Sequence, residues 1–113
     1  MRYRWIVIAA VAGALGAGVL GAQERPGSAQ AQDRITQGQR MFTEQGCHGC
    51  HTIGKLGTPI GPDLSHLGGK RSEADLKAWL RDPAMQRPAA HMPKLELTEE
   101  QIGVLAAFLA SLK

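Results

Sequence analysis

The chain has 113 residues, the size of one small domain, and a formal net charge of +3. From residue 32 onward, ten basic residues face nine acidic ones, and no basic stripe of the kind that binds nucleic acid is present. This near-neutral balance excludes nucleic acid as a partner. A domain of roughly 80 residues with three aromatic side chains also has difficulty burying enough apolar surface to be stable alone.

The N-terminal segment has the pattern of an export signal. Arg2 and Arg4 precede an uncharged apolar run over residues 5–22, and Ala29-Gln30-Ala31 offers a cleavage site before Gln32. The run is long for a signal peptide and short for a membrane span, so a cleaved signal and a retained anchor are both compatible with it. The arginines before it place the rest of the chain outside the cytoplasm. The predicted organisation is a signal or anchor plus linker over residues 1–31, and one domain over residues 32–113.

The first helix of the domain is expected to begin with Asp33 as its N-cap and to end near Gln45. Before it, residues 23–31 are expected to form an irregular linker, because they show no periodicity. Gly38 lies in the middle of the helix, where glycine costs about 1 kcal/mol relative to alanine. That cost suggests the close approach of another helix.

The most specific pattern in the chain is Cys47-His48-Gly49-Cys50-His51, a C-x-x-C-H string. This spacing is the attachment signature of a c-type haem. The two thiols can form thioether bonds, and the imidazole of His51 follows at once and can reach the iron. These are the only two cysteines of the chain, so attachment would use every thiol present. His48 is interpreted as the variable, solvent-facing residue inside the motif.

Two further helices are expected after the motif, and no strand. Glycine and proline make residues 52–67 a loop. The capping box Ser72-Glu73-Ala74-Asp75 opens a helix that ends near Arg81, before Asp82-Pro83. Residues 84–97 are expected to be extended or turning. A second capping box, Thr98 to Gln101, then opens the C-terminal helix.

The second axial ligand of the iron is not decided by the residues alone. Met85, His91 and Met92 lie in the segment after the second helix, far enough along the chain to return to the iron. His66 is a fourth candidate. A thioether ligand would favour ferrous iron and raise the reduction potential.

Several segments together resemble the small monohaem class I cytochromes c of bacteria. The resemblance covers roughly residues 33–113. The residues that carry it are Gly38 and Phe42 before the C-x-x-C-H motif, Gly61-Pro62-Asp63-Leu64, Trp79-Leu80-Arg81-Asp82-Pro83, and Met92-Pro93 before a capped C-terminal helix.

The resemblance implies an all-α class I cytochrome c fold. About three helices would surround one covalently attached haem c, preceded by an N-terminal hydrophobic signal or anchor helix. The first and last helices would cross at Gly38. Met92 would be the distal ligand opposite His51, the Pro62 carbonyl would accept the Nδ1 proton of His51, and Trp79 would contact a haem propionate.

The expected function is electron transfer rather than catalysis, because two protein ligands leave the iron no open site for a substrate. Single electrons would pass between redox partners in the periplasm or at the outer face of the membrane. Residues 5–22 would hold the chain there if retained, as an anchored subunit of a respiratory or dehydrogenase complex. A gas sensor or peroxidase is the less favoured alternative, since no distal acid or base cluster is evident. Structural zinc lacks a second ligand pair at the required spacing.

Overall fold

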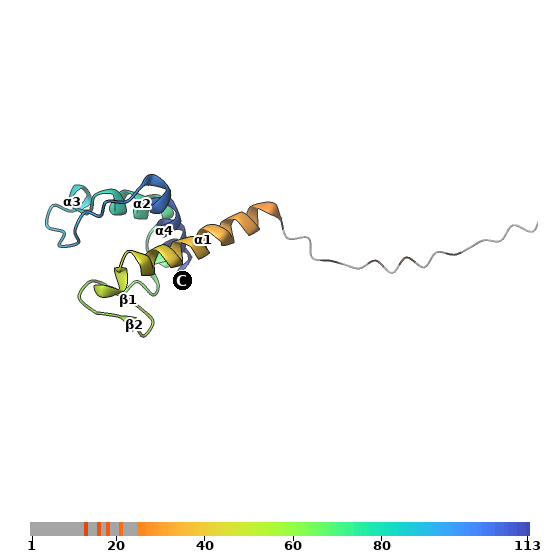
Figure 1. Cartoon of the computed structure of the whole chain (residues 1–113), viewed down its shortest axis with the longest axis horizontal. Helices are drawn as coiled ribbons and strands as arrows, with labels where there is room; N and C mark the ends of the chain where they lie inside the picture. Colours follow the sequence, from red (N-terminus) through yellow and green to blue (C-terminus); the bar gives the residue numbers. More distant parts are fainter. Residues whose placement is uncertain (1–12, 14–15, 17, 19–20, 22–24) are drawn as a thin grey trace, which may run out of the picture.

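The computed structural model describes Gly13, Gly16, Gly18, Gly21 and residues 25–113. In chain order the elements are α1 (Pro26–Glu44), the short 3₁₀ helix η1 (Cys47–Gly49), β1 (Thr52–Ile53), β2 (Leu56–Gly57), the 3₁₀ helix η2 (Leu67–Gly69), α2 (Glu73–Arg81), α3 (Pro83–Gln86) and α4 (Glu99–Ser111) (Figure 1). The predicted all-α class is confirmed. The expected N-terminal signal or anchor helix lies outside the described residues. Among the helices that are described, none is long and apolar enough to cross a membrane.

Helix α1 begins earlier than the sequence indicated. It starts at Pro26 rather than after Asp33, so the prediction of an irregular linker is wrong for residues 26–31. Proline is favourable in the first turn because its missing N–H would have no helical partner there. The alanines and glutamines that follow are good helix formers, although no apolar stripe marks them. The helix therefore continues through the predicted cleavage position.

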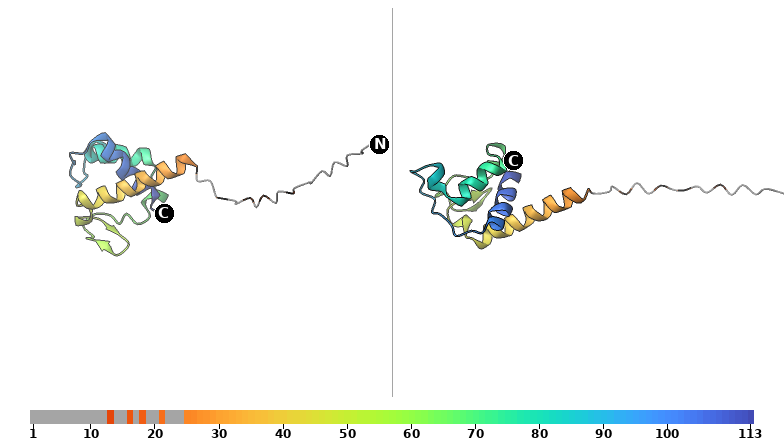
Figure 2. Two further views of the ribbon diagram at one scale, coloured as in Figure 1. Left: turned by 45° about the vertical axis from the view of Figure 1, so that its right-hand side comes forward. Right: turned by 90° about the horizontal axis from the view of Figure 1, so that it is seen from above.

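The core forms where α4 lies across α1 (Figure 2). A Cβ atom placed on Gly38 would lie 1.9 Å from the Val104 carbonyl oxygen and 2.6 Å from the Phe108 Cβ, so only glycine permits this approach. The rings of Phe42 and Phe108 pack edge to face with centroids 5.8 Å apart. The crossing expected at Gly38 is confirmed.

Helix α4 is the central element of the domain. It contacts α1, α2 and η2, so it is buried on more than the single stripe that its periodicity suggested. Its buried residues are Ile102, Val104, Leu105, Ala106, Ala107, Phe108 and Leu109. Its capping box is present as predicted, with the Thr98 hydroxyl accepting from the Gln101 N–H and the Gln101 side chain accepting from the Thr98 N–H.

Helix α2 begins at the predicted capping box of Ser72 and Asp75 and ends before Pro83. Leu76 and Leu80 bury its inner face. The residues after it differ from the expected irregular segment, because Pro83–Gln86 form one more helical turn, α3. Asp82 explains that turn, since its carboxylate accepts the Ala84 N–H and caps a helix with proline in first position.

A hairpin of two short strands, each two residues long, replaces part of the expected loop. Ile53 pairs with Leu56 and Thr52 with Gly57 in antiparallel register. Gly54 and Gly57 have φ values of 59° and 105°, a left-handed backbone that favours glycine. The prediction of no strand was wrong here, because strands of two residues are too short to leave an alternating pattern.

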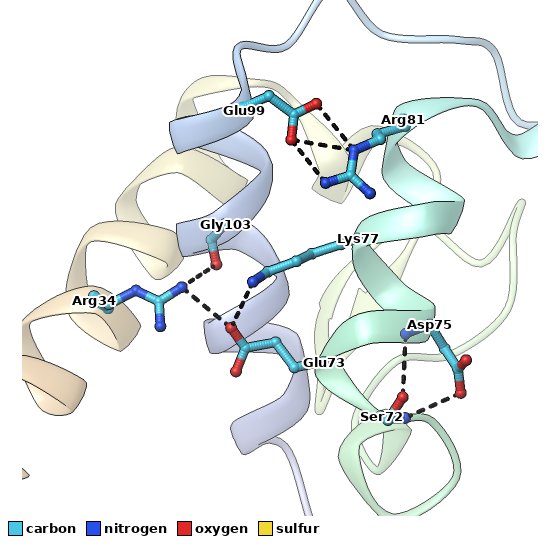
Figure 3. A network of polar contacts seen from close by, with 8 residues as sticks. All are labelled: Arg34, Ser72, Glu73, Asp75, Lys77, Arg81, Glu99 and Gly103. Atoms are coloured by element: carbon cyan, nitrogen blue, oxygen red, sulfur yellow. Dashed lines mark hydrogen bonds and ion pairs between the residues drawn. The ribbon is translucent and has the colours of Figure 1, made fainter.

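Polar contacts tie the three main helices together (Figure 3). Arg34 of α1 donates to the Glu73 carboxylate of α2 and to the Gly103 carbonyl of α4, both at 3.1 Å. Lys77 approaches the same carboxylate at 3.5 Å. At the other end of α2, Arg81 donates to both carboxylate oxygens of Glu99. Exposed pairs contribute little to the free energy of folding, so these contacts add to the apolar packing that holds α2 against α4.

Candidate functional site

The C-x-x-C-H motif lies on one tight turn directly after α1. Gly46, with a φ of 73°, turns the chain out of the helix. The Cys47 carbonyl then accepts the N–H of Cys50 at 3.2 Å and of His51 at 3.0 Å. Residues three and four positions apart lie on the same face of a helical turn. Both thiols and the imidazole are therefore presented together.

The two thiols differ in environment. Cys50 is exposed, whereas Cys47 is half-buried and packs against the hydrophobic core. Burial raises the pKa of the Cys47 thiol, and the neighbouring Cys50 adds to this, while a backbone hydrogen bond acts in the opposite direction. Both are free thiols, as attachment of a group through sulfur requires.

The imidazole of His51 is held by the loop that follows the hairpin. Its Nδ1 lies 2.7 Å from the carbonyl oxygen of Pro62. Because a carbonyl can only accept, Nδ1 carries the proton, and Nε2 retains a lone pair for a metal. A Cβ on Gly61 would lie 2.7 Å from the Cε1 of His51, so the glycine makes room for the ring.

A cluster around Asp63 fixes this loop, and the motifs of the sequence did not point to it. The carboxylate accepts hydrogen bonds from the Thr52 hydroxyl at 2.9 Å and the Ser65 hydroxyl at 2.8 Å. The Ser65 hydroxyl oxygen also accepts the N–H of Gly54. Asp63 thereby joins the loop that carries the Pro62 carbonyl to the hairpin that follows His51. The sequence shows only that Ser65 follows two positions after Asp63; Thr52 lies eleven positions earlier, so its pairing with Asp63 depends on the fold.

These hydrogen bonds predict acid sensitivity of the loop. The hydroxyls of Ser65 and Thr52 lower the pKa of Asp63 in the folded protein. The carboxylate therefore stabilises the fold above its unfolded pKa, and this stabilisation disappears as the pH falls through the lower, folded pKa. In urea unfolding between neutral and acidic pH, Asp63→Asn should lose less stability than the wild type on acidification. Glu44→Gln, at the exposed end of α1, is the control. Parallel pH profiles for wild type and Asp63→Asn would contradict the prediction.

The candidates for the second ligand lie in different environments. Met92 is half-buried against the hydrophobic core, and its Sδ accepts the indole N–H of Trp79 at 3.1 Å. Met85 is 78% exposed. His91 is exposed, and so is His66, whose Nδ1 lies 2.9 Å from the Lys113 carbonyl oxygen. Of these four side chains, the structure places only Met92 against the core that Cys47 also borders.

The interpretation of His48 as a solvent-facing residue was wrong. Its ring is half-buried and packs edge to face on Phe42, with centroids 4.7 Å apart. Its Nδ1 is buried and, among the described residues, has no hydrogen-bond partner. The tight turn of the motif directs this side chain toward the end of α1, which the spacing of the motif alone does not reveal.

The chain is similar to known proteins over most of the domain that the structure describes. The family model for cytochrome c matches residues 35–113. Two relatives are cytochrome c oxidase subunit 2 of Alkalihalophilus pseudofirmus, 35% identical over 68% of this chain and 25% of the relative, and a nitric oxide reductase subunit of Stutzerimonas stutzeri, 25% identical over 76% and 63%. Cytochrome c oxidase subunit 2 of Bacillus sp. (strain PS3) is 34% identical over 68% of this chain and 26% of the relative. The chain thus spans from about a quarter to less than two thirds of the length of these relatives.

The fold and the site are those of a haem-binding domain. The chain belongs to the cytochrome c family. Its prosthetic group is therefore covalently bound haem c. The residues fit this group, because the structure offers two free thiols, an oriented imidazole and a space at Gly61 that a Cβ atom would fill.

Proposed function

We propose that Cys47 and Cys50 attach the haem, and that His51 and Met92 are its two axial ligands. The observation that carries the proposal is the Pro62 carbonyl 2.7 Å from the Nδ1 of His51, which orients the ring and increases its basicity as a ligand. Met92 supplies a soft thioether at the same core that Cys47 borders.

Bound haem supplies reversible one-electron exchange between ferrous and ferric iron. The residues of the chain then decide how that exchange is used. With His51 and Met92 both bound to the iron, no position would remain for a substrate, which supports an electron carrier rather than a catalyst of its own. A thioether ligand would favour the ferrous state and raise the potential. Buried apolar side chains of α4 and α2, such as Leu105 and Leu76, keep water from the core.

Replacement of Met92 tests the ligand assignment. Met92→Ala, produced in a host that attaches haem, should lose the weak far-red absorption band that a methionine ligand gives to ferric haem. Its ferrous form should also bind carbon monoxide rapidly, because one coordination position is free. The matched control is Met85→Ala, since this methionine is 78% exposed. A far-red band that survives in Met92→Ala would overturn the assignment.

We further propose that the domain is exported and acts at the outer face of a membrane, within or beside a respiratory complex. The apolar run at residues 5–22 and the names of the relatives, which are subunits of an oxidase and a reductase, support this. The predicted boundary at residue 31 belongs to this proposal. The mass of the protein isolated from the membrane and soluble fractions of the cell distinguishes a cleaved chain from a full-length chain. Loss of the first 31 residues favours a free carrier, and a full-length chain in the membrane fraction favours an anchored subunit.

A further inference from the structure

We propose that residues 26–33 of α1 form a rigid strut, which holds the haem-attachment motif at a fixed height above a membrane. The inference rests on the proposed retention of residues 5–22 as an anchor, and it names the element that connects this anchor to the iron site. In the sequence, three residues, 23–25, separate the apolar run from the helix. At about 3.5 Å per residue, they can add no more than about 10 Å of slack.

The strut stands clear of the rest of the domain. In Figure 1 and in the right-hand view of Figure 2, this end of α1 (orange) extends beyond the other helices. Every residue from 27 to 34 is exposed, and Ile35 is the first residue of the helix that packs against the core. The strut carries one charge, at Asp33, and no large apolar side chain. A helix that is polar all round has no face to bury, and such helices bridge separate structures through solvent.

The strut is helical because it continues a helix that the core has already nucleated. Starting a helix is unfavourable, whereas each added residue costs little if it is a good helix former. Residues 29–32 alternate alanine and glutamine, which are such residues. Pro26 opens the first turn, and there the Ser28 hydroxyl donates to the Arg25 carbonyl at 2.7 Å. Local chemistry therefore extends the helix without any help from packing.

The base of the strut is held by both neighbouring helices. At Gly38 the backbone of α4 lies so close to α1 that a Cβ atom would meet the Val104 carbonyl oxygen at 1.9 Å. This crossing sets the direction in which α1 leaves the domain. One turn earlier, Arg34 adds hydrogen bonds to Glu73 of α2 and Gly103 of α4, both at 3.1 Å (Figure 3).

The opposite end of α1 carries the haem-attachment motif. The helix runs without a break for 19 residues, which span about 28 Å at 1.5 Å per residue. The N–H groups of the next two residues bond back to helix carbonyls at 2.9 and 3.1 Å, and Cys47 then begins the motif. The strut, the crossing and the motif thus lie on one rod. A fixed height suits a redox partner that is held in the same membrane.

Lengthening the strut tests this height. The haem-loaded full chain is placed in phosphatidylcholine vesicles with a small fraction of lipid that carries a fluorescent headgroup, which haem quenches by energy transfer. Seven residues of alternating alanine and glutamine inserted after Gln32 add two turns and should raise the haem by about 10 Å. Energy transfer from a plane falls with the inverse fourth power of height, so quenching should decrease about threefold for a rod of this length.

The matched control is an insertion of seven glycine and serine residues at the same point. Such a linker is flexible, so the domain can tilt toward the lipid. Energy transfer is weighted to the closest approach, and quenching should therefore not decrease. An equal decrease with both insertions, or none with either, would overturn the proposal.

A distance measurement in detergent tests the stiffness of the strut directly. Haem attachment uses Cys47 and Cys50, so nitroxide labels on Ala29→Cys and Ala74→Cys report the separation of the strut from α2 by pulsed EPR of the ferrous full chain. One narrow distance distribution is expected. Gln32→Pro should broaden it, because proline removes a helical hydrogen bond and clashes with the carbonyl four residues earlier. Gln32→Ala should leave it narrow, and a broad distribution without the proline would overturn the proposal.

Failure of the anchor gives a different result. If the protein isolated from cells has lost its first 31 residues, the proposed anchor fails and the strut falls with it. If the full-length chain is present in the membrane fraction but the distance distribution is broad, or both insertions act alike, only the strut is overturned.

Discussion

Gly38→Ala is expected to lower the free energy of unfolding by about 3 kcal/mol, the upper end of the range for inserting a methyl group into a packed interface. The new Cβ would lie 1.9 Å from the Val104 carbonyl oxygen and 2.6 Å from the Phe108 Cβ. Neither atom can rotate away, because one belongs to the α4 backbone and the other is attached directly to it. The two helices would have to separate, and the packing of Phe42 on Phe108 would be lost with them.

Chemical denaturation of the haem-loaded protein measures this effect. Gly103→Ala in α4 is the matched control, since a Cβ there meets only the end of the Arg34 side chain, at 3.5 Å. Its unfolding free energy should change by no more than about 1 kcal/mol, the difference in helix propensity. Equal stability of Gly38→Ala and Gly103→Ala would show that the two helices cross less closely than in the structure.

Gly61→Ala should have the largest effect on the iron site with little effect on the rest of the fold. Its Cβ would lie 2.7 Å from Cε1 and 3.0 Å from Nδ1 of His51, and 3.3 Å from the Cys50 carbonyl oxygen. The ring is confined between this position and the Pro62 carbonyl, so it must turn and lose the 2.7 Å hydrogen bond. Loss of such a supporting partner typically weakens metal binding by about 10–100-fold.

Absorption spectra of the ferric and ferrous forms report this weakening as a high-spin fraction and as faster binding of carbon monoxide. Gly69→Ala is the control, because a Cβ at that exposed position meets nothing within 4 Å. A wild-type spectrum for Gly61→Ala would mean that the loop can move without disturbing His51. The contact would then be too soft to orient the ring.

Local patterns predicted those parts of the molecule that depend on neighbours in sequence. The capping boxes at Ser72 and Thr98 begin α2 and α4 as expected, because each satisfies its N–H groups within four residues. The C-x-x-C-H spacing brings two thiols and an imidazole together for the same reason. The extension of α1 to Pro26 was missed because an exposed helix of alanine and glutamine has no apolar periodicity to reveal it.

Contacts between segments that are distant in sequence could not be predicted from local patterns. The bond between Trp79 and Met92, and the junction of Arg34 with Glu73 and Gly103, join residues 13 to 69 positions apart. No spacing rule specifies such pairs, since they depend on how α2 and α4 pack. His48 belongs here too, because only the position of Phe42 at the end of α1 decides that its ring is half-buried.

By itself, the sequence determined the attachment chemistry of this protein: two thiols and an imidazole at a short spacing, in a domain too small to form a large core. The reason is that covalent attachment requires particular groups at a short spacing, which is written directly in the chain. Only the tertiary structure decided how these groups are supported. Pro62 orients His51, Asp63 secures that loop, and Trp79 reaches Met92, because each contact joins residues that are brought together only when the chain folds.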